Sequence, residues 1–188
     1  FTVSVGGFER LPEFVELYHE TMTRVGASQN YFFPVTYFTE LRQCLQHDLE
    51  LCSVLSPEGK LAAAAFFTRC QGIVQYHLSA SSEEFRRLSP AKLIIQEMIR
   101  WSQARGCRAL HLGGGYGVGN DPLLRFKAGF SPLRSHYRSW RTILHPVAYD
   151  HLLERAAIST SEETDFFPPY RAVTCHRSSD SGQLAAAS

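Results

Sequence analysis

A run of glycines two-thirds of the way along the chain constrains its fold more than any other feature. Five glycines fall within residues 113–119, directly after an apolar stretch over residues 109–112. Glycine is favoured where the backbone takes a positive φ or approaches a ligand closely. The next residues carry helix signals, because Asp121 suits an N-cap, Pro122 the first helical position and Gly129 the position just past the end. The pattern predicts a strand, a glycine loop and a short helix in succession.

This loop and helix form a candidate anion-binding site. The N–H groups of a glycine loop, with Arg125 and Lys127 on the helix that follows, suit an anion or a developing oxyanion. A tight turn whose glycines solve only a steric problem is the alternative. Two nucleotide-binding motifs are excluded, since the chain has no Gly-Lys-Ser/Thr of a P-loop and its glycines do not spell G-x-G-x-x-G. Dinucleotide binding is therefore not expected.

Composition excludes several classes of protein. With 188 residues, 44% of them hydrophobic, and a net charge of +1, the chain has the size of one globular domain and no overall preference for nucleic acid or membrane. It contains neither a transmembrane run nor a signal peptide. The five scattered cysteines form no C-x-x-C and indicate buried or half-buried thiols in a reducing, cytoplasmic compartment. The eight histidines lack ligand spacing, so no metal is expected.

Hydrophobic periodicity predicts an alternation of strands and helices in the α+β class. The expected strands are residues 2–5, 49–55, 61–69, 73–79, 108–112 and 137–144. The expected helices are residues 11–25, one from Pro34, one from Pro90, the short helix after Asp121, and residues 146–157. The three strands between residues 49 and 79 read as an antiparallel meander, and the helix from Pro90 as a crossover that makes 73–79 and 108–112 parallel neighbours in a mixed (α/β) sheet. Ligands bind at the carboxyl ends of such strands.

The domain organisation is expected to be simple. Residues 1–171 form one domain, and residues 172–188 a disordered or expression-derived tail, because they are polar and rich in alanine. The chain begins at Phe1 rather than Met, which indicates that the natural N-terminus is missing and leaves room for a preceding domain or a second subunit.

The element order and several separated motifs resemble the FemAB/FemX-like branch of the GNAT acyltransferase superfamily. These motifs are Thr21-Met-x-Arg24, Tyr31-Phe-Phe33, Tyr76-His-Leu-Ser-Ala80, Leu112-Gly-Gly-Gly115, Asp121-x-Leu-x-x-Phe-Lys127 with Phe130, and Phe166-Phe-Pro-x-Tyr-Arg171. The branch includes peptidoglycan-bridge aminoacyltransferases, which generally carry two such domains; this chain resembles the C-terminal copy. The resemblance implies a GNAT-like fold and transfer of an acyl or aminoacyl group to an amine of a cell-envelope or small-molecule acceptor.

One departure from the superfamily pattern bears on the donor. GNAT domains that bind acetyl-CoA carry R/Q-x-x-G-x-G/A before the crossover helix, where N–H groups grip the pyrophosphate. Residues 86–91 keep the arginine and the alanine, but Ser89 replaces a glycine and Pro90 has no N–H to donate. This difference favours aminoacyl-tRNA over acyl-CoA as the co-substrate, with no tightly bound cofactor. An acyl-CoA-dependent N-acyltransferase is the alternative.

Lys127 is the leading catalytic candidate. The resemblance places this lysine beside the transferring ester, where an ammonium would stabilise the tetrahedral oxyanion; otherwise it interacts only with the helix dipole. His77, the second candidate, would accept the proton of the amine as a general base, or serve only as a hydrogen-bonded structural residue. The expected substrate- and donor-binding residues are Tyr76, Ser79, Arg86, Arg87, Leu112, Gly113, Gly114, Gly115, Arg125 and Phe126.

Two further alternatives stay open at this level. Arg134 and Arg138, four residues apart in the expected late strand, suit phosphate contact or a solvated face equally. Tyr31, Phe32 and Phe33 are expected to pack in the core. The chain as a whole could also be a non-catalytic GNAT-like half that supports a partner domain, but such a half would not need an intact glycine loop with Lys127.

Overall fold

A computed structural model describes residues 1–115, 121–156 and 167–171 of the chain. The chain divides into two compact units, Phe1–Pro132 and Leu133–Ser188. The strands are β1 (Thr2–Val5), β2 (Leu49–Leu55), β3 (Leu61–Cys70), β4 (Ile73–Ser81) and β5 (Ala109–His111). The α-helices are α1 (Leu11–Arg24), α2 (Val35–Leu45), α3 (Ala91–Ala104), α4 (Pro122–Ala128) and α5 (Pro146–Arg155).

The first unit is built on a mixed sheet in which the strands follow the order β1-β2-β3-β4-β5. The first four strands are antiparallel neighbours, and β5 runs parallel to β4. The β3–β4 turn is tight because Gln71 and Gly72 both take positive φ angles, 49° and 73°, as a two-residue hairpin loop requires. The predicted α+β class, the meander and the parallel pair are confirmed.

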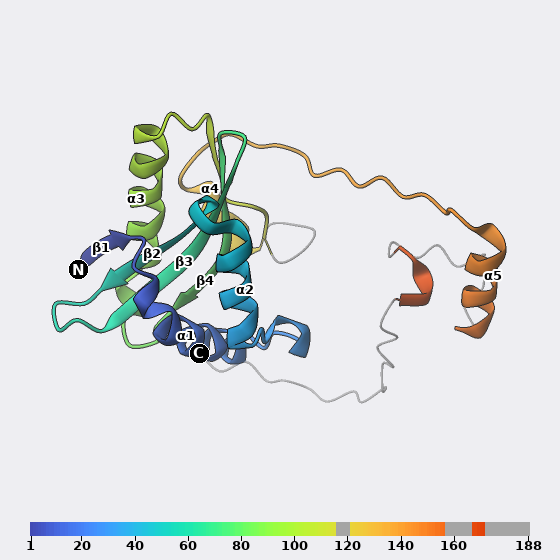
Figure 1. Ribbon diagram of the computed structural model, residues 1–188, viewed down its shortest axis with the longest axis horizontal. Helices are drawn as coiled ribbons and strands as arrows, with labels where there is room; N and C mark the ends of the chain where they lie inside the picture. The colour runs from blue at the N-terminus through green and yellow to red at the C-terminus, as the bar shows by residue number, and fades with distance from the viewer. Residues whose placement is uncertain (116–120, 157–166, 172–188) are drawn as a thin grey trace, which may run out of the picture. The chain divides into compact units, whose positions relative to one another are not determined.

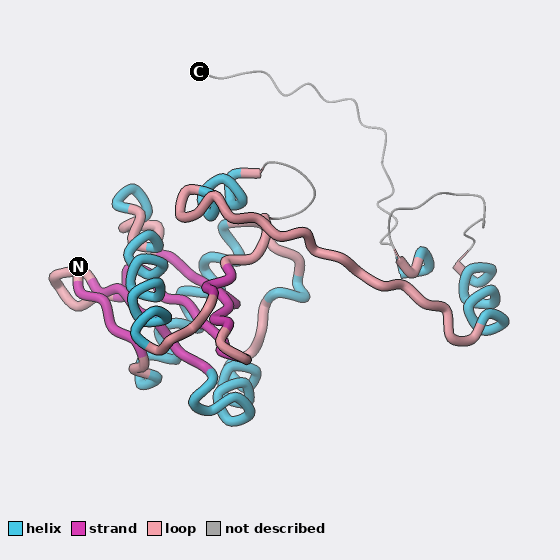
Figure 2. Tube along the Cα trace, turned by 90° about the horizontal axis from the view of Figure 1, so that it is seen from above, coloured by secondary structure: helices cyan, strands magenta, loops and turns pink. Residues whose placement is uncertain are grey.

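Helices cover both faces of this sheet, with α1 and α2 on one side and α3 on the other (Figures 1 and 2). On the first side Phe14 packs edge-on against Phe66 with ring centroids 4.8 Å apart. On the second side Ile94 and Met98 of α3 are fully buried against the sheet. The central strand β3 carries four consecutive alanines, residues 62–65, between these layers, and their small side chains let the helices approach its backbone closely.

A β-bulge in β4 changes which side chains face each helical layer. Phe67 pairs with Tyr76 but Phe66 pairs with Leu78, so His77 is the extra residue. As a result Tyr76 belongs to the cluster under α3, whereas Leu78 packs with the cluster under α1 and α2. The strand therefore presents different faces to the two layers before and after the bulge.

The parallel pairing of β4 and β5 is short. It joins Ile73 with Ala109, Val74 with Leu110 and Gln75 with His111, and then it stops. From there β4 continues to Ser81. The segment after β5 enters the glycine loop at Gly113, whose φ is +75°. Past this point the two backbones no longer pair, and we call the place where they part the opening between β4 and β5.

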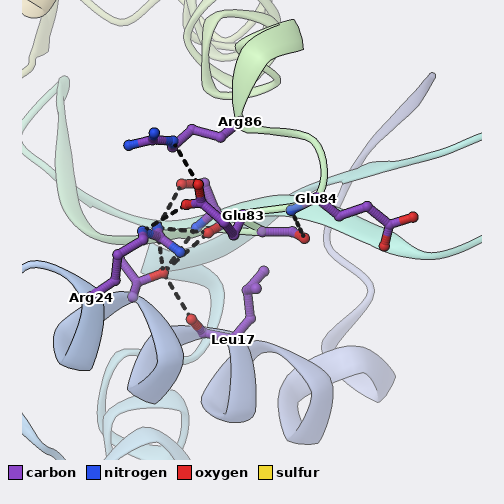
Figure 3. A network of polar contacts seen from close by, with 8 residues as sticks. Leu17, Arg24, Glu83, Glu84 and Arg86 are labelled. Atoms are coloured by element: carbon purple, nitrogen blue, oxygen red, sulfur yellow. Dashed lines mark hydrogen bonds and ion pairs between the residues drawn. The ribbon is translucent and has the colours of Figure 1, made fainter. Parts of the chain in front are cut away.

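Polar contacts attach α1 to the carboxyl end of β4 (Figure 3). The Thr21 hydroxyl oxygen accepts from the Ser81 N–H at 3.2 Å, and its hydroxyl donates to the Leu17 carbonyl at 2.8 Å. Arg24 donates through Nη2 to the Ser81 carbonyl at 2.8 Å. The contacts of Thr21 and Arg24 with Ser81 join residues about 60 positions apart in the chain. The Thr-x-x-Arg spacing of α1 therefore fixes the far end of β4 to the first helix.

In the second unit, α5 packs against the short helical turn at Pro169–Arg171. Tyr149 lies 6.1 Å from Phe167 and 5.7 Å from Tyr170, ring centroid to ring centroid. The end of the Phe-Phe-Pro-x-Tyr-Arg motif thus has a packing role. Residues 157–166 and 172–188, including the expected tail, lie outside the described residues.

The expected strand over residues 137–144 is wrong. The described segment between α4 and α5 contains no strand, and Tyr137 and Trp140 are each 93% exposed. A strand needs a neighbour for its N–H and C=O groups, and alternation alone does not supply one. The common face of Arg134 and Arg138, which rested on that strand, is lost with it.

Gly129 follows the end of α4 at Ala128, as predicted, and takes a right-handed φ of −67°. Smaller expectations about burial need correction. Cys44, Cys70 and Tyr31 are exposed rather than buried, although Phe33 does pack against the core. The carbonyl of Tyr31 nevertheless accepts from the buried Tyr18 hydroxyl at 2.9 Å, so this loop is held through its backbone.

Replacing Thr21 by Val tests the attachment of α1 to β4. The change keeps the shape of the side chain but leaves the Ser81 N–H without its acceptor, so the free energy of unfolding should fall by about 1–3 kcal/mol. Thr23→Val is the matched control, since the exposed Thr23 hydroxyl bonds only to the His19 carbonyl of its own helix. Denaturant unfolding of both variants gives the comparison, and equal losses would contradict the role of Thr21.

Candidate active site

The opening between β4 and β5 is covered by Lys127. The Asp121 carboxylate caps α4 by accepting from the Leu124 N–H at 2.9 Å, so the predicted N-cap is confirmed and the helix starts at Pro122. Lys127 on this helix donates from Nζ to the Gly114 carbonyl at 2.7 Å. The same Nζ lies 5.5 Å from the centre of the Tyr76 ring. The short helix therefore carries a cation back over the glycine loop to the edge of β4.

Backbone conformation and close contacts explain why two positions of the loop, 113 and 115, carry glycine. Gly113 takes a positive φ, and a Cβ there would lie 3.5 Å from the Lys127 Nζ. The Asp121 carboxylate packs so closely on Gly115 that no side chain fits there. Gly117 and Gly119 lie outside the described residues. Gly113 thus takes the positive φ that the sequence predicts, whereas the constraint at Gly115 comes from the Asp121 side chain.

Burial shapes the electrostatics around Lys127. Partial burial lowers the pKa of Lys127 below its ordinary value, and the nearby Asp121 carboxylate opposes that shift. Burial also raises the pKa of Tyr76, with a smaller opposing effect from its hydrogen bond with the Ser79 side chain. Tyr76 therefore stays a neutral phenol beside the ammonium. An ammonium held at a fixed place is suited to stabilise an oxyanion.

His77 lies on the other side of the sheet from Tyr76 and Lys127. Its Nε2 is 3.3 Å from the Tyr37 hydroxyl of α2, which belongs to the cluster under α1 and α2. The residue is exposed as a whole, yet partial burial of its ring lowers the pKa below the ordinary 6.5. A neutral imidazole can accept a proton. The two catalytic candidates thus lie on opposite faces of the sheet.

The loop before α3 follows the carboxyl end of β4. Ser89 takes a positive φ of 52°, the conformation that glycine adopts without strain. Its N–H donates to the Arg86 carbonyl at 3.0 Å, and the N–H groups of Lys92 and Leu93 donate to the Ser89 and Pro90 carbonyls, both at 3.0 Å. Pro90 has no N–H at all. Most of the backbone donors of this loop are therefore used inside the chain.

The remaining sequence candidates differ in their surroundings. Ser79 and Leu112 are half-buried at the carboxyl ends of β4 and β5, beside Tyr76 and Gly113. Arg87 and Arg125 are exposed, and Arg86 pairs with Glu83 through Nε at 3.1 Å. Phe126 instead packs edge-on against Phe130 with centroids 5.4 Å apart.

Sequence reasoning missed Tyr37 and Glu83. Tyr37 is 40 residues from His77, and no local pattern indicates that contact. Glu83 stands three residues before Arg86, a spacing that suits an ion pair within one turn and was the available signal.

The described residues were also compared with the requirements of a metal site, a membrane span and a ligand cavity. The described ranges contain no group of three or more His, Cys, Asp or Glu residues that could hold a metal ion. In the same ranges no helix has the length and apolarity to cross a membrane. A hollow of about 510 Å³ lies along α2, and it contains none of the candidate residues. It is lined by Phe8, Thr39, Arg42, Gln43 and Gln46.

Solved structures share this fold at low sequence identity. A probable acetyltransferase matches with a TM-score of 0.59 and 13% identity, over 77% of this chain and 99% of its own. The ribosomal-protein-alanine N-acetyltransferase from Brucella melitensis biovar Abortus 2308 matches with a TM-score of 0.57 and 12% identity, over 77% and 100%. The aminoglycoside antibiotic 6′-N-acetyltransferase from Acinetobacter baumannii matches with a TM-score of 0.54 and 10% identity, over 77% and 97%.

At the level of sequence, no curated protein matches this chain. The acetyltransferase (GNAT) domain family does match, over residues 1–127. That range takes in the whole sheet, the glycine loop and the helix as far as Lys127. The chain therefore belongs to the GNAT acetyltransferase domain family and is an acyltransferase.

Proposed function

We propose that this chain transfers an aminoacyl group from aminoacyl-tRNA to an amine, at the opening between β4 and β5. The observation that carries the proposal is the Lys127 ammonium above that opening, held 2.7 Å from the Gly114 carbonyl and 5.5 Å from the Tyr76 ring. The resemblance of its motifs to the FemAB/FemX-like branch supports a cell-envelope or small-molecule amine as acceptor. Membership of the GNAT family supports acyl transfer to an amine as such.

The chemistry follows from the position of the charge. The amine nitrogen attacks the ester carbonyl carbon, and the carbonyl oxygen becomes an oxyanion. The Lys127 ammonium stabilises that oxyanion, because a cation aimed at charge that develops in the transition state lowers the barrier. The intermediate then collapses, the C–O bond of the ester breaks, and the leaving oxygen takes a proton from water, to which the His77 imidazolium in turn returns the proton of the amine. His77, as a neutral imidazole on the opposite face, accepts the proton that the amine loses.

The loop before α3 supports the choice of donor. A pyrophosphate needs free N–H groups at this loop and at the start of the helix. Here the N–H groups of Ser89, Lys92 and Leu93 already donate to carbonyls of the chain, and Pro90 has none. An aminoacyl ester at the 3′ end of a tRNA has no pyrophosphate that these N–H groups would need to bind.

An acyl-CoA-dependent N-acyltransferase is the second candidate, and family membership favours it. Two of the enzymes that share the fold are named as N-acetyltransferases of ribosomal-protein alanine and of an aminoglycoside antibiotic. Both names describe transfer to an amine. A non-catalytic half that supports a partner domain is disfavoured, since it would not need Lys127 placed over the opening.

Binding of acetyl-CoA tests the donor. We expect calorimetry of the chain with acetyl-CoA to show a dissociation constant well above micromolar, while labelled aminoacyl-tRNA supports transfer to amine acceptors. A dissociation constant of about 1 μM or lower, equivalent to roughly −8 kcal/mol, would contradict the aminoacyl-tRNA proposal and move the enzyme to the acyl-CoA class.

Lys127→Met tests the oxyanion role, because it removes the charge and keeps a long side chain with good helix propensity. We expect turnover to fall by about two to three orders of magnitude. Donor affinity should change far less, and the free energy of unfolding should fall by about 1 kcal/mol for the lost hydrogen bond. Lys60→Met, at an exposed lysine paired with Glu84, is the control. Equal losses of affinity and turnover would make Lys127 a binding residue only.

The pH profile tests His77. Because partial burial lowers its pKa below 6.5, the imidazole stays neutral to lower pH than a free histidine, and kcat/KM should decline only below pH 6.5. His77→Asn should reduce kcat/KM by about two orders of magnitude or more and abolish that acidic decline. His47→Asn, at an exposed histidine, is the control. An unchanged acidic decline in His77→Asn would exclude His77 as the base.

A further inference from the structure

We propose that Glu83 determines donor specificity, by neutralising Arg86 and repelling any donor that carries a pyrophosphate. The inference rests on the proposed function in one respect: that the loop over residues 86–91 faces the donor. Glu83 does not touch the reacting atoms in this account. It acts through Arg86, the cation that the loop offers to a phosphate.

The Glu83 carboxylate lies between two guanidinium groups (Figure 3). One oxygen is 3.1 Å from Nε of Arg86, and the other is 3.4 Å from Nε of Arg24. A phosphate that bound the same Arg86 guanidinium would come within a few ångströms of this carboxylate. Like charges at such a separation repel, and the bound anion would lose part of the attraction that Arg86 supplies.

Glu83 is held in this place from two elements. Arg24 is itself fixed to the end of β4, since its Nη2 donates to the Ser81 carbonyl at 2.8 Å. The backbone carbonyl of Glu83 also accepts from the Arg86 N–H at 3.2 Å. The carboxylate thus has a defined position between α1 and the loop, unlike an isolated acid on a flexible surface.

Charge matters more at this loop than at a glycine-rich one. Because the N–H groups of Ser89, Lys92 and Leu93 are already engaged, the charged side chains of Arg86 and the exposed Arg87 supply much of the attraction that residues 86–91 can offer a phosphate. Cancelling one of these two charges removes a large part of what remains. Two features of the loop therefore disfavour pyrophosphate binding: Pro90 lacks an N–H donor, and Glu83 repels the phosphate charge.

The neighbouring Glu84 provides a matched control. It is an acid of the same size at the next position, but its side chain points away from Arg24 and Arg86 in Figure 3. Both of its carboxylate oxygens accept from the Lys60 ammonium, at 3.0 and 3.1 Å. Removing its charge changes the net charge of the chain equally without releasing Arg86.

The test measures the affinity of Glu83→Gln, Glu83→Asp, Glu84→Gln and the unchanged chain for two probes. Acetyl-CoA carries the pyrophosphate, and acetyl-pantetheine carries the same thioester without phosphates. We expect Glu83→Gln to bind acetyl-CoA about tenfold more tightly at low salt, with the gain shrinking as salt screens the charges. Its affinity for acetyl-pantetheine should not change. Glu83→Asp and Glu84→Gln should stay within about twofold of the unchanged chain for both probes.

Each result decides between roles. A Glu83→Gln chain that binds acetyl-CoA equally or more weakly overturns the inference. A change of the same size for both probes also overturns it, because it would indicate a structural role. The proposed function fails separately: absence of aminoacyl transfer in all four proteins, with the tenfold difference intact, would contradict that function and leave the role of Glu83 standing.

Discussion

Parallel pairing between β4 and β5 lasts for three residue pairs, and the candidate active site depends on where it ends. Beyond Gln75 and His111 the backbones part, because the segment after β5 enters the glycine loop whereas β4 continues along the sheet. Beyond Gln75, β4 continues for the six residues from Tyr76 to Ser81, which span roughly 17 Å from first to last at 3.3 Å per residue. Its exposed edge leads from the Lys127 ammonium towards the loop before α3.

The bulge at His77 adds a second property to this edge. It lets Tyr76 stand under Lys127 on the α3 side while His77 contacts Tyr37 of α2. A cation for the oxyanion and a neutral base for the amine can then serve one reaction from opposite faces, without pairing with each other. The carboxyl end of the same strand is tied to α1 through Thr21 and Arg24, so the edge has a fixed position at both ends.

Much of the fold could be predicted from the sequence, because local signals and tertiary structure agree there. A strand-like run ended by turn residues located β2 to its residue bounds, and Asp121 with Pro122 located the start of α4. Residues 137–144 were expected to form a strand from their alternation but form none, since pairing depends on a neighbour that a local pattern cannot reveal. The bulge at His77, the contact of His77 with Tyr37 and the position of Glu83 between two arginines likewise arise from residues brought together by folding. Lys127 could be proposed beforehand through motif resemblance, whereas its hydrogen bond to Gly114 required the structure.

The central claim is that acyl transfer takes place at the opening between β4 and β5, and NMR of the ¹⁵N-labelled chain tests it most directly. The titrant is a 3′-aminoacylamino-adenosine, a stable mimic of the aminoacylated tRNA end, with acetyl-CoA as a second titrant. The account predicts that amide resonances of Tyr76, Ser79, Gly113 and Gly114 shift with the mimic, and that those along the α2 hollow, such as Gln43, do not. Shifts confined to α2, with unchanged resonances at Tyr76 and Gly114 for both titrants, would contradict it.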